Sequence, residues 1–346
     1  MRGSDKAMAQ PEARPGWAAT LARMEGAYAP SSVQAYAREF SRFARWCEAE
    51  GRCAFPADGE TVAGYVSHSF PSCARNTVVQ RLRAIRMAHR LGELPDPTYA
   101  VPVQLAFRRG RREHGRPAKQ AYGLTAELRD RLLAACPSDL LGLRAQLILR
   151  VGYDGLLRRS ELIRLQVEGF ERLPDGTGRV QVRRAKADDP DPRNMAYLSI
   201  ATTEVVCAWL RRTGLERGPL VRALWRGQVL PGAADVRTVN NTIRLAARRA
   251  GVEPAIARRL TGHSLRVGAV QDLAASGRSL VEILRAGRWR HLSTVAHYVQ
   301  GAPVNVWAER ADTPAGGPEE KRLWRSAEQW APRAVRPAKA ADGAGD

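Results

Sequence analysis

The sequence predicts a mainly α-helical protein of two domains, with a small antiparallel β-sheet in the C-terminal domain (an α+β arrangement). Apolar residues recur at helical spacing over most of residues 17–107 and again over most of residues 121–305. Between these regions, residues 108–120 are almost bare of apolar side chains. Only two short stretches, 178–184 and 195–200, alternate as strands do, and we expect them to form the sheet.

The composition indicates a nucleic-acid partner. The 346 residues include 55 Lys and Arg against 35 Asp and Glu, which gives a net charge of +20 at pH 7. A solvated surface does not need such an excess, whereas DNA or RNA would be attracted by it. No run of about 18 apolar residues is present to span a bilayer, and the first residues lack the apolar centre of a signal peptide. We therefore expect a cytoplasmic protein with no membrane partner.

The cysteines and histidines predict neither a disulfide framework nor a metal centre. There are five cysteines, an odd number, and they form no C-x-x-C pair. The six histidines show no H-E-x-x-H or similar spacing. We therefore expect reduced thiols, and no metal, cofactor or small-molecule substrate.

The first domain is predicted to consist of helices with clear end signals. Ser31 or Ser32 is the expected N-cap of the first of these helices, and Gly51 is its expected stop. Gly92 is the expected stop of the last one. The predicted helices of this domain are 31–50, 59–70 and 73–92.

The faces of these helices that lie opposite the apolar stripes are basic. A single arginine there is as readily a solvated surface residue as a DNA contact, but two such helices with few acids favour DNA contact. The segment 108–120 is predicted to be a basic linker that follows a phosphate backbone or serves only as a hinge, and its composition fits both. The expected DNA contacts in these regions are Arg42, Arg75, Gln80, Arg83, Arg108, Arg112 and Lys119.

The second domain is predicted to be helical on both sides of the sheet, with Thr125 as the N-cap of its first helix. The tail, 306–346, is predicted to contain a loop, a candidate helix at 319–331 and a disordered end at 332–346. The predicted helices of the domain are 125–137, 139–157, 159–167, 202–214, 235–251, 261–277 and 279–287. In the helix 235–251, the side chains suited to DNA base edges are Arg237, Asn240, Asn241 and Arg244.

The stretch L-T-G-H-S-L-R-V-G-A-V (260–270) combines apolar positions with charge. His263 and Arg266 lie three residues apart, on one face of the predicted helix. A buried arginine without a partner is costly, so an anion is expected beside it, either a carboxylate of the protein or a ligand. No acid stands three or four residues from Arg266, which favours a phosphate of DNA.

Further motifs occur in order along the second domain. They are G-L-L-R-R-S-E-L (155–162), a lysine at 186, T-G-H-S-L-R-V-G (261–268), A-G-R-W (286–289) and H-Y (297–298). With these motifs the chain resembles the tyrosine recombinase (phage integrase) family over most of residues 17–305. The motif with His263 and Arg266 would be weak support alone, but the whole set of motifs in this order is specific for the family. The resemblance implies the fold of that family, a two-domain clamp around duplex DNA.

The resemblance also assigns catalytic roles. Tyr298 would attack phosphorus, and Arg158 and Arg266 would grip the nonbridging phosphate oxygens. Lys186 would be the general acid for the leaving oxygen, and His263 would bind the phosphate or take the tyrosine proton. Trp289 offers one indole N–H, and Glu161 would orient a catalytic partner. Considered singly, these residues have plainer interpretations: a core tyrosine, a solvated turn lysine, or an Arg158–Glu161 pair within one helix.

The activity implied by the resemblance is site-specific recombination through a 3′-phosphotyrosyl intermediate and a Holliday junction, without a metal ion. The implied assembly is a homotetramer on double-stranded DNA with paired inverted-repeat sites. Its protomers would exchange a C-terminal helix at 304–311 or 319–331. A bacterial, phage or plasmid origin and association with the nucleoid are implied as well. Two rival interpretations are a type IB topoisomerase, which relaxes DNA without exchanging partners, and a DNA-binding repressor that has lost catalysis.

Overall fold

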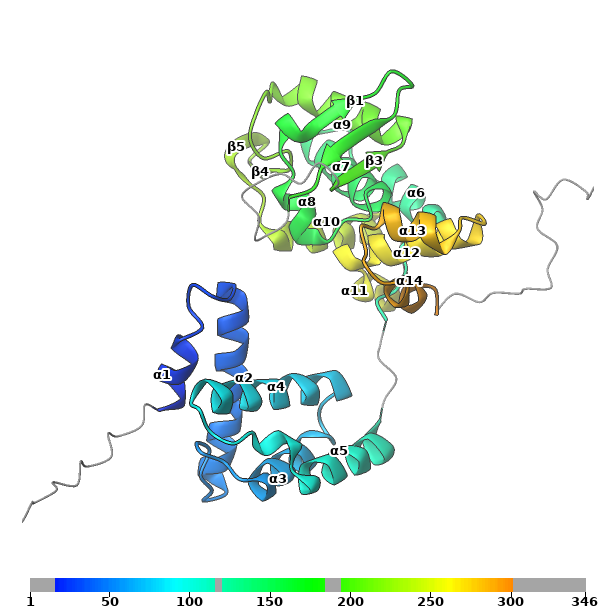
Figure 1. Cartoon of the computed structure of the whole chain (residues 1–346). Helices are drawn as coiled ribbons and strands as arrows, with labels where there is room; N and C mark the ends of the chain where they lie inside the picture. The colour runs from blue at the N-terminus through cyan, green and yellow to red at the C-terminus, as the bar shows by residue number, and fades with distance from the viewer. Residues whose placement is uncertain (1–15, 116–119, 184–193, 301–346) are drawn as a thin grey trace, which may run out of the picture. The chain divides into compact units, whose positions relative to one another are not determined.

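The computed structural model of the chain describes residues 16–115, 120–183 and 194–300. Two separate clusters of buried apolar side chains form, one between Leu21 and Ala106 and one between Leu124 and Tyr298. We describe the two regions by themselves, as the N-terminal part and the C-terminal part (Figure 1). The prediction of a mainly helical fold with antiparallel β-structure is confirmed. Four of the predicted features lie outside the described residues: Lys119, Lys186 and the two candidate exchange helices.

The described N-terminal part is entirely helical. Its core contains Phe40, Phe43 and Ile85, whose side chains are fully buried. α2 packs against α4, and α3 packs against α5. The elements are α1 (Trp17–Ala22), α2 (Pro30–Ala49), α3 (Gly59–Ser69), α4 (Arg75–Leu91), the 3-10 turn η1 (Pro97–Tyr99) and α5 (Val101–His114).

Two boundaries in the N-terminal part differ from the prediction. α2 has Ala29 as its N-cap and Pro30 in its first turn, so neither Ser31 nor Ser32 caps it. The predicted linker begins inside a helix, because α5 continues to His114. Gly110 lets α5 pack closely against the Phe70 ring, since a Cβ there would lie 2.2 Å from it.

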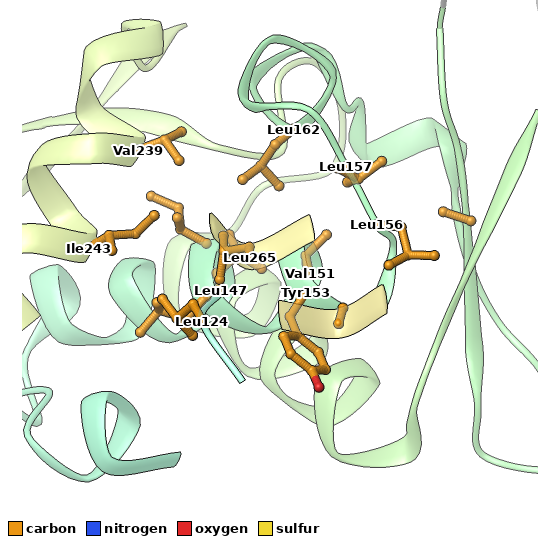
Figure 2. Close-up of a cluster of buried hydrophobic side chains, with 14 of the residues drawn as sticks. Leu124, Leu147, Val151, Tyr153, Leu156, Leu157, Leu162, Val239, Ile243 and Leu265 are labelled. Carbon is orange, nitrogen blue, oxygen red and sulfur yellow. The ribbon is translucent and has the colours of Figure 1, made fainter. Parts of the chain in front are cut away.

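The C-terminal part is built around α7, whose apolar residues are buried on several sides (Figure 2). Figure 2 shows Leu147 and Val151 of α7 in one cluster with Ile243 of α10 and Leu265 of α12. The helices are α6 (Ala126–Ala134), α7 (Leu140–Asp154), α8 (Arg159–Arg164), the 3-10 turn η2 (Val167–Gly169), α9 (Ile200–Thr213), α10 (Val236–Arg249), α11 (Pro254–Arg259), α12 (Gly262–Ala275), α13 (Leu280–Ala286) and α14 (Leu292–Val299). The sequence analysis did not single out α11 and α14.

The predicted antiparallel pair of strands is present, and the described residues contain a second sheet that was not predicted. β2 (Gly178–Gln181) and β3 (Met195–Leu198) are the predicted strands, and β1 (Phe170–Arg172) adds to the other edge of β2. β4 (Arg222–Trp225) and β5 (Gln228–Ala233) form a separate hairpin. Its two-residue turn, Arg226–Gly227, has left-handed backbone at both positions. Arg-Gly is a weaker hairpin signal than Asn-Gly, which explains why the sequence did not reveal it.

The last three helices, α12 to α14, lie together (Figure 1, yellow to orange). Gly268 of α12 lies against the start of the C-terminal part, where a Cβ would be 1.9 Å from the Leu124 carbonyl oxygen. One turn later, the Asp272 carboxylate accepts hydrogen bonds from the Ala126 amide at 2.6 Å and from the Tyr153 hydroxyl. These contacts fix the helix that carries His263 and Arg266.

None of the described helices combines the length and the apolar character needed to cross a membrane. The described residues also hold no group of three or more His, Cys, Asp or Glu side chains arranged to bind a metal ion. All five cysteines are free thiols.

Candidate active site

Tyr298 lies at the point where three segments of the C-terminal part meet. Its side chain, on α14, is only 7% exposed. The ring centroid lies 5.5 Å from that of His263 on α12 and 5.2 Å from that of Trp289 in the turn after α13. The Arg266 guanidinium lies 5.9 Å from the same ring. The structure therefore brings together four of the residues that the sequence singled out.

Arg266 is fully buried, and the protein supplies part of the negative charge expected beside it. Its guanidinium donates to the carbonyl oxygens of Leu156 at 2.7 Å and Gly287 at 3.2 Å. A carboxylate oxygen of Glu161 lies 3.7 Å away. The expectation that DNA phosphate is the simplest partner was therefore incomplete, because this acid comes from a distant part of the sequence. Among the described residues, the buried Arg266 Nε has no hydrogen-bond partner.

Glu161 connects a buried arginine with an exposed one. Arg158, the N-cap of α8, donates from its side chain to Glu161 at 2.6 Å and from its backbone amide at 2.8 Å. The side chain of Arg158 is 58% exposed, whereas that of Glu161 is 18% exposed. Burial alone would raise the pKa of Glu161, but these hydrogen bonds and the charges of Arg158 and Arg266 lower it below the ordinary value. The Arg158–Glu161 pair considered in the sequence analysis is therefore present, and the Glu161 carboxylate also lies near Arg266.

A groove of about 420 Å³ lies beside these residues and is lined by Arg158, Glu161, Arg288 and Trp289 among others. The neighbouring Arg159 is not part of its lining. Two further lining residues, Arg183 and Asn194, directly flank the segment 184–193, which lies outside the described residues. The groove is strongly basic, and Glu161 is the one acid among its lining residues. Such a site suits a phosphate group.

Trp289 is held in one orientation by close packing. Its ring is 8% exposed, and the Arg266 guanidinium lies 4.4 Å from the ring centroid. Gly287 is required beside it, because a Cβ at that position would come within 2.0 Å of the indole ring. In the described part of the chain, the buried Trp289 Nε1–H has no acceptor. The indole is therefore a fixed donor at the edge of the groove.

His263 lies in the first turn of α12, where a neutral imidazole is favoured. Partial burial lowers the pKa of His263 below its ordinary value, and the nearby charges of Arg266 and Arg158 lower it further. A neutral imidazole has one ring nitrogen free to accept a proton. Tyr298 is the nearest hydroxyl-bearing ring in contact with it.

Two of the base contacts predicted on α10 have structural roles here. The Asn240 side-chain oxygen accepts a hydrogen bond from the Gly262 amide at 2.8 Å, so it is already used at the start of α12. Arg244 Nε donates to the Leu260 carbonyl oxygen at 3.3 Å. Arg237 is paired with Asp235 at 3.0 Å, and Asn241 is exposed. Both Asn240 and Arg244 thus support the segment that leads to His263, a role that the sequence did not indicate.

The contacts predicted on the N-terminal part lie at its surface. Gln80 lines a groove between α2 and α4 together with Asn76. Arg42 is hydrogen-bonded to Glu39 at 3.1 Å. The remaining predicted contacts in the described residues are exposed: Arg75 and Arg83 on α4, and Arg108 and Arg112 on α5 rather than in a linker.

Two residues near the site were missed by the sequence analysis. The Gln120 side-chain amide donates to the carbonyl oxygens of His297 at 3.0 Å and Tyr298 at 2.9 Å. Arg288 donates to the Gly155 carbonyl oxygen at 2.7 Å. Neither contact has a local signal, because each joins residues more than a hundred positions apart in the chain.

The sequence model of the phage integrase family matches residues 123–303. Recombinase Cre of Escherichia phage P1 is 28% identical over 275 residues, which cover 75% of this chain and 80% of that protein. An integrase/recombinase XerD homolog of Selenomonas ruminantium is 26% identical over 309 residues, which cover 84% of this chain and 86% of that protein.

Solved structures of recombinases share the fold. The XerH site-specific recombinase bound to palindromic difH substrate matches with a TM-score of 0.58 at 15% identity, covering 86% of this chain and 80% of that one. A lambda integrase tetramer bound to a Holliday junction matches with a TM-score of 0.57 at 12% identity, covering 84% and 78%. More than half of the chain, with Tyr298 and the arginines around it, is matched by the family model, and the chain therefore belongs to the phage integrase family, the family of tyrosine site-specific recombinases.

Proposed function

We propose that this protein cuts and rejoins DNA strands through a covalent intermediate on Tyr298. The hydroxyl oxygen of Tyr298 attacks the scissile phosphorus, and the bond from phosphorus to the 5′ oxygen breaks. A 3′-phosphotyrosyl bond forms, and a free 5′-hydroxyl is released. The 5′-hydroxyl of a partner strand then attacks the same phosphorus and expels Tyr298. The observation that supports this most is the meeting of Tyr298 with His263, Arg266 and Trp289 beside the basic groove.

The arginines and the tryptophan stabilise the charge that develops on the phosphate. Arg158 is more than half exposed and is paired with Glu161, whereas Arg266 is fixed by backbone carbonyls. The Trp289 N–H donates to a phosphate oxygen. Because Arg266 and Trp289 are held in largely buried positions, they lose little orientation when the reaction begins. Glu161 holds Arg158 and Arg266 in position rather than touching the phosphate.

Two residues transfer protons. His263 takes the proton from the Tyr298 hydroxyl, which its lowered pKa allows at neutral pH. Lys186 donates a proton to the departing 5′ oxygen. Support for Lys186 comes from its neighbours, since Arg183 and Asn194 on either side of its segment both line the groove.

The DNA partner is a duplex with paired inverted-repeat sites, on which four protomers assemble. The lambda integrase relative is a tetramer on a Holliday junction, and the net charge of +20 suits a DNA-bound assembly. The N-terminal part through α5, which ends at His114, and residues 121–305 form the two halves of a clamp, and the exchanged helix is 304–311 or 319–331. Exposed apolar residues on α13 and at the start of α14 offer a surface for it: Leu280, Val281 and Leu292.

A suicide duplex tests the proposed reaction. Genomic fragments that flank the gene are screened for inverted repeats, and a duplex that carries the bound repeat is nicked next to the expected cleavage position. The wild-type protein is expected to form a covalent protein–DNA adduct that resists denaturation, and Tyr298→Phe is expected to form none. Tight binding of the duplex without an adduct would favour the interpretation as a DNA-binding repressor that has lost catalysis. Relaxation of plasmids that lack the repeat would indicate the topoisomerase instead.

A further inference from the structure

Two turns bring catalytic side chains to the groove, and each contains a non-glycine residue with left-handed backbone. Leu156, with φ of 49°, stands two residues before Arg158. Arg288, with φ of 55°, stands directly before Trp289. L-residues other than glycine rarely adopt this conformation, and it persists where the surrounding structure holds it in place. We therefore looked for the contacts that hold these two turns.

Arg266 provides one connection between the turns. It donates to the carbonyl oxygen of Leu156 in the first turn at 2.7 Å and to that of Gly287 in the second at 3.2 Å. Arg266 is already proposed to bind the phosphate, so its hydrogen bonds to the two turns come in addition to a catalytic role.

Arg288 provides a second, parallel connection. Its guanidinium donates to the carbonyl oxygen of Gly155 in the first turn at 2.7 Å and to that of Ala286 in the second at 3.0 Å. A longer contact of 3.5 Å reaches the carbonyl oxygen of Met195 at the start of β3. The donors of Arg288 thus bond the backbone of three segments that surround the groove.

We propose that Arg288 is a positioning residue for strand cleavage, which holds the two turns together so that Arg158 and Trp289 face the phosphate in fixed geometry. This inference rests on the proposed recombinase function. Burial lowers the pKa of Arg288 to about 10, so the side chain remains charged at neutral pH and its hydrogen bonds to carbonyl oxygens are strong. Glycine would suit the backbone of position 288 better than arginine. The side chain, rather than the backbone, must therefore account for the role of arginine there.

The substitution Arg288→Gly separates the two effects, because it relieves the left-handed backbone and removes the side-chain connection. Its matched control is Arg226→Gly in the β4–β5 turn, where another arginine has left-handed backbone, with φ of 47°. Four proteins are compared: the wild type, Arg288→Gly, Arg226→Gly and Arg288→Lys. The single-turnover rate of adduct formation is measured at saturating suicide duplex, and DNA affinity is measured separately. We expect Arg288→Gly to slow adduct formation about 10- to 100-fold with affinity unchanged within about twofold. Arg226→Gly should match the wild type, and Arg288→Lys should fall between the two.

Hydrogen exchange gives a second readout that does not depend on activity. Peptides that cover 153–160 report on the first turn, which is remote in sequence from the substitution. Their exchange should be faster in Arg288→Gly than in Arg226→Gly, because the Gly155 carbonyl loses its partner. Wild-type rates of adduct formation in Arg288→Gly, or unchanged exchange over 153–160, would overturn the inference. A wild-type protein that forms no adduct would contradict the proposed function, and exchange over 153–160 would still decide whether Arg288 connects the turns.

Discussion

Glu39 in the N-terminal part and Glu161 in the C-terminal part are both largely buried carboxylates paired with arginines, but only Glu161 has a fully buried arginine beside it. Glu39 is paired with Arg38 and Arg42 at 3.1 Å and with Arg81 at 3.9 Å. The side chains of Arg38 and Arg42 are 63% and 43% exposed, whereas that of Arg81 is 15% exposed. Glu161 is paired with one exposed arginine and with Arg266, which is fully buried.

This difference separates affinity from catalysis. An exposed guanidinium is screened by water and salt, so it contributes mainly to attraction of the DNA backbone. A guanidinium that is buried and bonded to carbonyl oxygens has a fixed position, and its charge acts more strongly in the less polar surroundings. The comparison predicts that substitutions around Glu161 reduce the rate of cleavage, whereas those around Glu39 change the affinity for DNA and its dependence on salt.

The largest effect is expected for Arg266→Lys. Lysine keeps the positive charge, but its single nitrogen does not reproduce the planar fork that bonds Leu156 and Gly287 from two separate nitrogens. Adduct formation should fall about 10²- to 10³-fold, the loss typical of removing a preorganised donor. Single-turnover kinetics on the suicide duplex measure this.

Arg144→Lys is the matched control for burial, since Arg144 is also buried, and donates to the Arg222 carbonyl oxygen at 3.3 Å, outside the site. It should lower the thermal midpoint without slowing adduct formation. Equal loss of rate in Arg144→Lys and Arg266→Lys would show that the effect is one of folding.

A smaller effect is expected for Gly287→Ala. The new Cβ would lie 2.0 Å from the indole ring, so Trp289, which lines the groove, must move. A displacement of about 1 Å costs up to about 100-fold in rate. Gly232→Ala is the control, because a Cβ there meets nothing within 4 Å. Identical adduct rates in the two variants would contradict the role of Trp289.

The helices were largely predictable from the sequence, because their apolar stripes and end signals are local. Gly92 ends α4 and Thr125 precedes α6, as expected. The errors in the predicted helix boundaries arose where tertiary contacts or an unexpected cap set the boundary. α2 begins at Pro30 with Ala29 as its N-cap, not with a serine cap. α5 continues through the basic stretch to His114, and its Gly110 packs closely against Phe70 at the end of α3, a contact distant in the sequence.

The site was predictable from its motifs only as a set of residue types. That Tyr298, His263 and Trp289 come together depends on the packing of α12, α13 and α14, which no single stretch encodes. The partner of Arg266 was misjudged because the search for an acid was confined to helical spacing, whereas Glu161 approaches from α8. Likewise, Asn240 had the right side chain for a base edge, but its oxygen is bonded to Gly262.

The pH dependence of adduct formation tests whether His263 is the base. The pKa of His263 is lowered from its usual 6.5. Below that lowered pKa the imidazole is protonated and cannot accept the tyrosine proton, so the rate under subsaturating DNA should be constant near neutral pH and fall about tenfold per pH unit in acid. His263→Asn should be slower and lack this fall, while His68→Asn in the N-terminal part should keep it. The same acid profile in His263→Asn would assign the fall to another group.

The smallest effect is expected for Arg42→Ala, which tests the other side of the comparison. Arg42 is partly exposed and shares Glu39 with two other arginines, so its loss leaves the carboxylate paired and the helix folded. If Arg42 contacts one DNA phosphate, the slope of log affinity against log salt should decrease by about one. The rate of adduct formation at saturating DNA should remain that of the wild type, because the side chain is absent from the groove around Glu161. Binding titrations at several salt concentrations measure the slope. If Arg42→Ala left the salt dependence of binding unchanged but reduced the rate of adduct formation at saturating DNA, the Glu39 and Glu161 clusters would no longer differ in role.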